Sequence, residues 1–211
     1  MFVNYSMNIS IFLFVLIIFI FSAIIHEVSH GAMAYYLGDP TAKNLGRLTL
    51  NPIPHIDPFG SIVLPLILLI PALFGYPTLV FGWAKPVPYD PRFLKNPLLG
   101  AALIAGAGPF SNLSIAFLLG TLIKFASLTP ALTMLFGSVV WVNIVLGIFN
   151  LVPIAPLDGS KVFVAFLGSR AHGFMRFMEQ YGMVILIVFI VWGFDFLVPI
   201  ISYLFKLFTG M

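Results

Sequence analysis

Long apolar stretches alternate with short polar ones along most of this chain. The apolar stretches cover residues 8–37, 97–123, 132–151 and 181–208. Each has at least the roughly 20 mostly apolar residues that a helix needs to cross a bilayer. The first stretch continues directly into a charged cluster, whereas a signal peptide ends at a small-residue cleavage site, so we interpret it as a retained helix. The pattern therefore predicts about four spanning helices.

A fifth stretch, residues 61–84, is uncharged but is interrupted by Pro65, Pro71, Gly75 and Pro77. If it crosses the membrane fully, at most six of the ten cations share the cytoplasmic side, but if it enters and returns, eight lie together. The eight are Lys43, Arg47, Lys85, Arg92, Lys95, Lys161, Arg170 and Arg176, against Lys124 and Lys206. Cytoplasmic loops carry an excess of Lys and Arg, so the distribution favours a re-entrant segment.

Composition agrees with this pattern. Hydrophobic residues make up 61% of the 211 residues and charged residues only 8%, with a mean hydropathy of +1.10. A soluble domain carries about 25% charged residues. The chain is therefore predicted to be an all-α multi-pass membrane protein in contact with the lipid bilayer, with one domain over residues 1–211. The net charge of +3 comes from scattered loop cations, which excludes a nucleic-acid partner. Without cysteine, the chain forms no disulfide and offers no thiolate to a metal.

The first apolar stretch contains the pattern H-E-x-x-H, formed by His26, Glu27 and His30. Residues four apart on a helix lie on one face, so both imidazoles can reach a single zinc ion. Glu27, beside them, can act as the general base for an attacking water. The alternative is a pair of interfacial histidines beside a solvated glutamate. Residues 9–25 before the motif are almost all apolar, however, and ionisable groups at such depth generally mark a functional site.

Catalytic zinc normally has three protein ligands and a water, so a third ligand is required. Asp158 is the favoured candidate. Pro153 and Pro156 unwind the apolar helix before it and expose backbone that needs a polar cavity, and Gly159 lets the chain turn away. The alternative is that Asp158 caps the next helix. The other candidates are Asp39, His55, Asp57, Asp90, His172, Glu179 and Asp195.

Three motifs in this order, HEVSH in an apolar helix, GPFSN in a later one and FNLVPIAPLDG after that, resemble the site-2 protease family of intramembrane zinc metalloproteases. The resemblance covers essentially the whole chain. It implies one Zn²⁺ per chain bound by His26, His30 and Asp158, with Glu27 as the catalytic carboxylate. It also implies an endopeptidase that cleaves transmembrane segments of membrane protein substrates. The expected location is the plasma membrane, with the active site near the cytoplasmic side.

The same resemblance implies supporting roles for other residues. Asn150, in the N-x-x-P part of the last motif, is expected to hold the substrate or its oxyanion. Gly108, Pro109 and Asn112 are expected to support packing around the site. Residues 43–50 and 78–87 resemble the short strands beside the active site of family members, whose edge could receive an unwound substrate. No PDZ-sized or nucleotide-binding insertion is present, so the chain resembles a minimal form.

The loop NPIPHIDPFGS, residues 51–61, allows two interpretations. His55 and Asp57 either assist the zinc site, with His55 as a donor to the substrate oxyanion, or they are ordinary turn residues. Asp195, inside the last apolar stretch, has a packing role or a functional one.

Two other classes of protein remain as alternatives. A divalent-metal transporter could also place His and carboxylates inside the membrane, but such proteins show paired interrupted helices in two repeats, and the sequence has no second copy of either interruption. A membrane-protein binder that does not cleave would have no need for Glu27.

Overall fold

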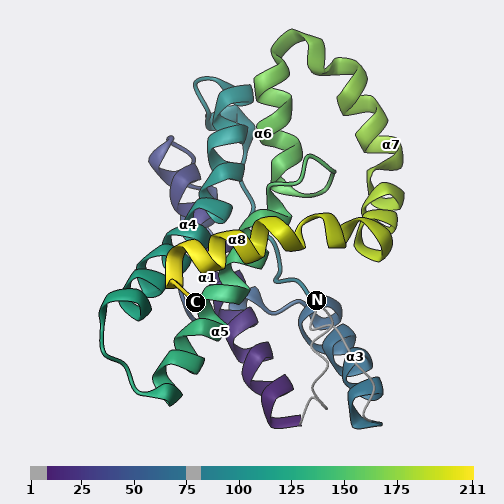
Figure 1. The fold of residues 1–211 in the computed structure, drawn as a ribbon. Helices are drawn as coiled ribbons and strands as arrows, with labels where there is room; N and C mark the ends of the chain where they lie inside the picture. The colour runs from purple at the N-terminus through teal and green to yellow at the C-terminus, as the bar shows by residue number, and fades with distance from the viewer. Residues whose placement is uncertain (1–8, 75–81) are drawn as a thin grey trace.

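The computed structural model describes residues 9–74 and 82–211, and every regular element in them is helical (Figure 1). The longer helices are α1 (Ile9–Tyr36), α3 (Leu64–Leu73), α4 (Pro97–Phe125), α5 (Pro130–Asn150), α6 (Asp158–Leu167), α7 (His172–Val188) and α8 (Val198–Thr209), and α2 (Thr41–Asn44) is a single turn. Short 3₁₀ or π turns cover Ile53–His55, Pro58–Val63, Pro91–Phe93, Gly168–Ala171, Phe189–Gly193 and Phe194–Phe196.

Four helical stretches are long and apolar enough to cross a membrane, namely Ser10–Tyr36, Pro97–Phe125, Pro130–Asn150 and His172–Phe196. The first three match the predicted stretches, and the prediction of a multi-pass helical membrane protein is confirmed. The prediction of one helix over residues 181–208 is wrong, because α8 is a separate helix that lies across α4 and α5 (Figure 1). Pro199 explains the break: proline has no backbone N–H and is tolerated only in the first turn of a helix, which is where it stands in α8.

α4 is the central helix and packs against α1, α5, α6 and α8 (Figure 1). Small residues on α4 let its neighbours approach closely, as is typical of helices packed in a membrane. A Cβ on Gly120, for example, would lie 2.6 Å from the Cβ of Phe208 on α8. The buried cluster where α4, α5 and α8 meet consists of Ala116, Val140, Ile144 and Ile201.

The segments before and after α3 are joined to each other by hydrogen bonds. The Trp83 N–H donates to the Gly60 carbonyl at 3.2 Å, and the Ser61 hydroxyl donates to the Trp83 carbonyl at 2.8 Å. The apolar helical stretch Pro58–Pro71 between these contacts is about 21 Å long at 1.5 Å per residue, whereas a bilayer core is about 30 Å thick. The chain therefore returns, at Trp83, to the point where this helical stretch begins.

The predicted short strands do not occur in the described residues. In residues 43–50 the chain leaves α2 and turns at Gly46, whose φ is +65°, and the Arg47 N–H donates back to the Ala42 carbonyl at 2.9 Å. Of residues 78–87, positions 78–81 lie outside the described residues, and positions 82–87 are extended without a partner strand. Pro86 and Pro88 have no N–H to donate, so this segment cannot pair with a strand on both of its sides.

Candidate metal centre

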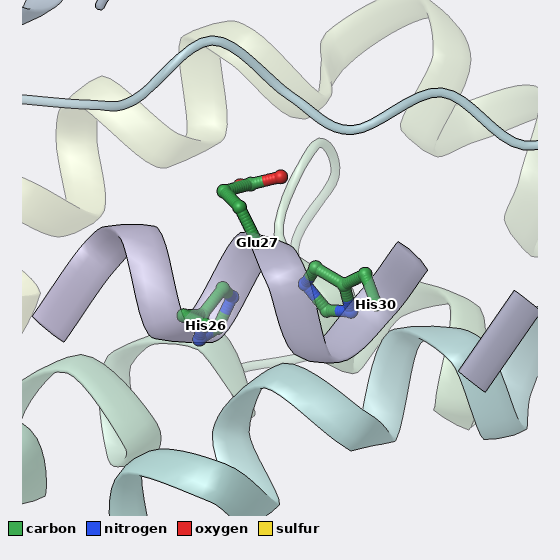
Figure 2. Close-up of side chains that lie close together, drawn as sticks. All are labelled: His26, Glu27 and His30. Carbon is green, nitrogen blue, oxygen red and sulfur yellow. The ribbon is translucent and has the colours of Figure 1, made fainter. Parts of the chain in front are cut away.

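His26 and His30 lie one turn apart on α1, and both are buried, with exposed fractions of 6% and 8%. Their ring centroids are 4.6 Å apart and the rings are perpendicular. One ligand atom from each histidine and one from Glu27 lie within 4.8 Å of one another. Figure 2 shows the two imidazoles along α1, with Glu27 extending from the helix toward a neighbouring length of chain. The H-E-x-x-H pattern thus forms a compact cluster inside a spanning helix.

Asp158 reaches the two histidines from the first turn of α6. Its Oδ2 lies 3.0 Å from His26 Nε2 and 3.1 Å from His30 Nε2. It is the first residue of the helix and not the N-cap, which is Leu157, so the capping alternative does not describe its place. Asp158 is 8% exposed, so a buried carboxylate lies against both imidazoles.

The second nitrogen of each imidazole fixes its tautomer. His26 Nδ1 lies 2.6 Å from Asn112 Oδ1, and His30 Nδ1 lies 2.6 Å from the Ile104 carbonyl oxygen. The amide nitrogen of Asn112 donates to two other acceptors, which leaves its oxygen for His26. Because both partners are acceptors, each Nδ1 must carry a proton. A neutral imidazole at either position then presents only a lone pair at Nε2.

Three acceptor atoms consequently converge: the Nε2 atoms of His26 and His30, and Oδ2 of Asp158. Buried acceptors at 3.0 and 3.1 Å repel one another unless a cation or added protons lie between them. Tetrahedral zinc, with bonds of about 2.0–2.2 Å, holds its ligand atoms roughly 3.3 Å apart, which is close to these separations. Two imidazoles and one carboxylate are also a usual donor set for catalytic zinc, with a fourth position left for water. The residues present therefore fit a zinc ion.

Gly108 on α4 creates the space that the imidazoles occupy. A Cβ at this position would lie 2.5 Å from His30 Cε1 and 2.6 Å from His26 Nε2. Ile104, Gly108 and Asn112 are spaced four residues apart, so one face of α4 receives both histidines. α4 thus supplies a hydrogen-bond acceptor to each imidazole, and the absence of a side chain at Gly108 leaves room for both rings.

A buried chain of polar side chains extends the site to α5. Asn112, with an exposed fraction of 0%, donates to Asn143 Oδ1 at 2.8 Å, and Asn143 donates to the Ser22 hydroxyl at 3.0 Å. The sequence predicts only a packing role for Asn112 and does not single out Ser22 or Asn143. The available signal was that Ser22 precedes His26 by one turn, and that Asn143 is an amide in the interior of an apolar helix.

The other predicted site residues lie outside this cluster. His55 is buried, its Nε2 lies 2.9 Å from the Thr49 carbonyl, and its Nδ1 has no partner in the described structure. A neutral His55 therefore has its proton on Nε2 and could donate to an oxyanion only with a second proton. Asn150 donates to the Leu146 carbonyl of its own helix at 3.0 Å. Roles in substrate binding for His55 and Asn150 stay predictions.

Most of the other candidate ligands have structural or surface positions. Asp57 accepts the N–H groups of Phe59 and Gly60 at the start of a helical turn, so it acts as a turn residue. The interior residue Asp39 accepts N–H groups from Thr41 and Asp90. Three further candidates are exposed, namely His172, Glu179 and Asp195.

A cavity of about 320 Å³ lies beside α1 on the face that carries Glu27. Ile20, Ala23 and Ile24 line it from α1, and they precede Glu27 by seven, four and three residues, which places them on its side of the helix. The wall opposite α1 includes Trp83 and His55, and nearly all of the lining is apolar. An apolar cavity therefore lies on the Glu27 side of α1, within the spanning stretch.

These features define a class: a multi-pass membrane protein with a hydrolytic type of zinc site inside a spanning helix. The comparisons with known proteins agree. A family model described as peptidase family M50 matches residues 119–193. Over 187 residues the chain is 37% identical to "Putative zinc metalloprotease YwhC" of Bacillus subtilis, an alignment that covers 84% of this chain and 80% of the relative. The chain belongs to peptidase family M50, the site-2 protease family, and is a zinc metalloprotease.

Other relatives carry similar names. The chain is 26% identical over 189 residues to "Putative zinc metalloprotease Rip2" of Mycolicibacterium smegmatis, covering 87% of this chain and 68% of that one. It is 40% identical over 107 residues to "Putative zinc metalloprotease Rip3" of Mycobacterium tuberculosis, covering 48% of this chain and 23% of that one. No solved structure matches the chain.

Replacing Gly108 with Ala tests the fit of the metal site. The added methyl would lie within 2.6 Å of both imidazoles, so we expect zinc affinity to fall by at least about 10-fold, as for other losses next to metal ligands. Gly106→Ala is the matched control on the same helix, because a Cβ there meets nothing within 4 Å. Zinc content of the purified variants under chelator competition is the measurement. Equal zinc affinity in both variants would contradict this reading of the site.

Proposed function

We propose that this protein is an intramembrane endopeptidase that cuts transmembrane segments of membrane proteins near the cytoplasmic side of the plasma membrane. The observation that carries the proposal is the position of the three converging acceptors. His26 and His30 lie within the spanning stretch Ser10–Tyr36, and Asp158 joins them from α6. We assign His26, His30 and Asp158 as the protein ligands of one zinc ion.

Bound zinc supplies a Lewis acid that activates water and polarises a peptide carbonyl. Glu27 takes the proton of the attacking water and returns it to the leaving amine, so that hydroxyl adds to the carbonyl carbon and hydrogen to nitrogen. Its Oε2 accepts the Val87 N–H at 2.8 Å, which holds the carboxylate at the side of the cluster. Asn150 and His55 are proposed to contact the substrate, Asn150 from the end of α5.

The apolar cavity supports a membrane-embedded substrate. A water-soluble peptide would gain little from walls built from Ile20, Ala23 and Ile24, whereas side chains of a transmembrane segment remain in apolar surroundings there. A helical substrate hides its carbonyls in hydrogen bonds, so we propose that it unwinds locally beside the extended residues 82–87 before cleavage.

The chain reversal at Gly60 and Trp83 supports a re-entrant segment. Hydrogen bonds join Gly60 to Trp83, and the helical stretch Pro58–Pro71 is only about 21 Å long, which fits entry and return on one side better than a crossing. With that arrangement, eight cations lie on the cytoplasmic side, the side near which the active site is proposed to lie. Lys124 stands on the opposite side, where its ammonium lies 3.5 Å from the Leu207 carbonyl of α8, next to Lys206.

Glu27→Gln tests the proposed chemistry. The amide oxygen of Gln still accepts the Val87 N–H, but the side chain cannot accept a proton at neutral pH. We expect zinc to be retained and the cleavage rate to fall by at least about 100-fold, the usual contribution of a general base. Purified protein in liposomes is incubated with a panel of single-span membrane proteins, with and without a zinc chelator. Cleavage by the variant at the wild-type rate would refute the mechanism, and zinc transport without cleavage would favour the transporter alternative.

Asp158→Asn tests the third ligand. The substitution keeps the shape but removes the charge that balances the dication, so zinc affinity should fall by about 10-fold or more. Asp57→Asn and Asp195→Asn are the controls, because neither carboxylate approaches the histidines in the structure. Zinc per protein is measured under mild chelator challenge. Full retention of zinc by Asp158→Asn would remove this residue from the ligand set.

Cysteine labelling tests the re-entrant segment, because the natural chain has no cysteine. Lys43 and Lys95 are exposed and flank the segment, and Ser127 is exposed in the α4–α5 loop. With single cysteines at these positions, a membrane-impermeant thiol reagent should label the first two from the same side and the third from the other. Labelling of the Lys43 and Lys95 variants from opposite sides would show that residues 61–84 cross the membrane fully.

A further inference from the structure

Residues 83–90 run past α1 as an extended segment that is held at successive backbone N–H groups. Three of these donors go to neighbouring parts of the chain: Trp83 to the Gly60 carbonyl, Lys85 to the His55 carbonyl and Asp90 to the Asp39 carboxylate, at 3.2, 2.8 and 2.7 Å. The fourth is the Val87 N–H, which donates to Glu27. The catalytic carboxylate is therefore one of the anchors of this segment.

Arg47 holds the same segment from its carbonyl side. Its Nη2 donates to the Lys85 carbonyl at 2.7 Å and to the Pro86 carbonyl at 3.3 Å. The residue is buried, with an exposed fraction of 8%, and within the described residues no carboxylate lies within 4 Å of it. A buried guanidinium with only backbone oxygens as partners is unusual, because a buried charge is normally paired with an opposite one.

The missing counter-charge is reached through one peptide group. The Pro86 carbonyl and the Val87 N–H belong to the same planar unit, with Arg47 at its oxygen and Glu27 at its hydrogen. A cation at the carbonyl oxygen polarises the peptide and strengthens its N–H as a donor. The order of charges, guanidinium, carbonyl, N–H and carboxylate, is attractive at every step.

Gly31 brings the two halves of this arrangement to Glu27. It lies one turn after Glu27 on α1, and a Cβ there would be 2.7 Å from Leu48 Cδ2 and 2.8 Å from Val87 Cγ1. Leu48 follows Arg47 directly. The glycine therefore lets the Arg47 segment and the Val87 segment pack together against the face of α1 that carries the catalytic carboxylate.

We infer that Arg47 is a positioning residue that orients Glu27 through the Pro86–Val87 peptide group. The inference rests on the proposed function, since it assigns Arg47 a part in the cleavage that Glu27 performs. Arg47 touches neither the metal ligands nor the cavity, so its effect is transmitted only through residues 85–87.

The test compares Arg47→Met, Arg47→Lys and the surface control Arg92→Met in the zinc-loaded protein, with a cleaved single-span substrate in liposomes. Arg47→Met should lower kcat by about 10-fold or more with KM changed less than about 2-fold, because substrate contacts are intact. Arg47→Lys should recover part of kcat, since an ammonium still binds a carbonyl but lacks the planar fork. Arg92 pairs with Asp90 at the surface, so Arg92→Met should match the wild type. Zinc content and thermal stability are measured on each variant.

A double-mutant cycle with Val87→Pro separates positioning from stability. Proline at 87 has no N–H to donate to Glu27, so it should lower kcat by a similar factor, and adding Arg47→Met should then cost little more. Multiplied losses in the double variant, or a rise in KM alone, would overturn the inference. If Val87→Pro loses zinc or stability, the kcat and KM of the two Arg47 variants decide. Wild-type kcat in Arg47→Met beside an inactive Glu27→Gln would refute the inference and leave the proposed function intact.

Discussion

The structure depends on the approach of three acceptor atoms in a part of the protein with little water. Asp158 Oδ2 lies 3.0 Å from His26 Nε2 and 3.1 Å from His30 Nε2. Because the Nδ1 atom of each ring donates a hydrogen bond, a neutral imidazole has no proton on Nε2. Such an arrangement is unfavourable without a cation. Zinc bound by the proposed ligands would connect α1 to α6, both of which pack on α4, and would link folding to metal binding.

α4 shapes this site more than the helix that carries the motif. Each imidazole needs an acceptor at Nδ1, and α4 supplies the Ile104 carbonyl and the Asn112 amide oxygen. The helix also needs to be narrow between them, which Gly108 provides. Because Asn112 is held in turn by Asn143, the orientation of the metal ligands is coupled to the contact between α4 and α5. This line joins buried polar side chains of α1, α4 and α5, namely Ser22, His26, Asn112 and Asn143.

The sequence predicted the parts that follow from local spacing. Residues four apart share a helix face whatever the tertiary structure, so His26 and His30 could be paired, and Pro153 and Pro156 marked the unwound chain before Asp158. The spans of α1, α4 and α5 followed from apolar length alone. Hydropathy could not show that residues 181–208 break at Pro199, because both sides of the break are equally apolar. The strand expected over residues 43–50 does not form, because turn geometry at Gly46 overrides the propensity of these residues.

Contacts between segments far apart in the sequence could not be predicted from residue spacing. They show that the site has two parts, which are held in place in different ways. The proposed metal ligands lie on helices, whose backbones fix the direction of each side chain. Glu27 also stands on α1, but its carboxylate is held by Val87, in an extended segment that has no helix or sheet to stabilise it. Four backbone N–H hydrogen bonds hold this segment in place of the hydrogen bonds of a sheet. Arg47 binds the Lys85 and Pro86 carbonyls, next to the residue that holds Glu27. In the proposed mechanism, the position of the proton-accepting Glu27 therefore depends on irregular backbone, whereas the positions of the metal ligands depend on the helical framework.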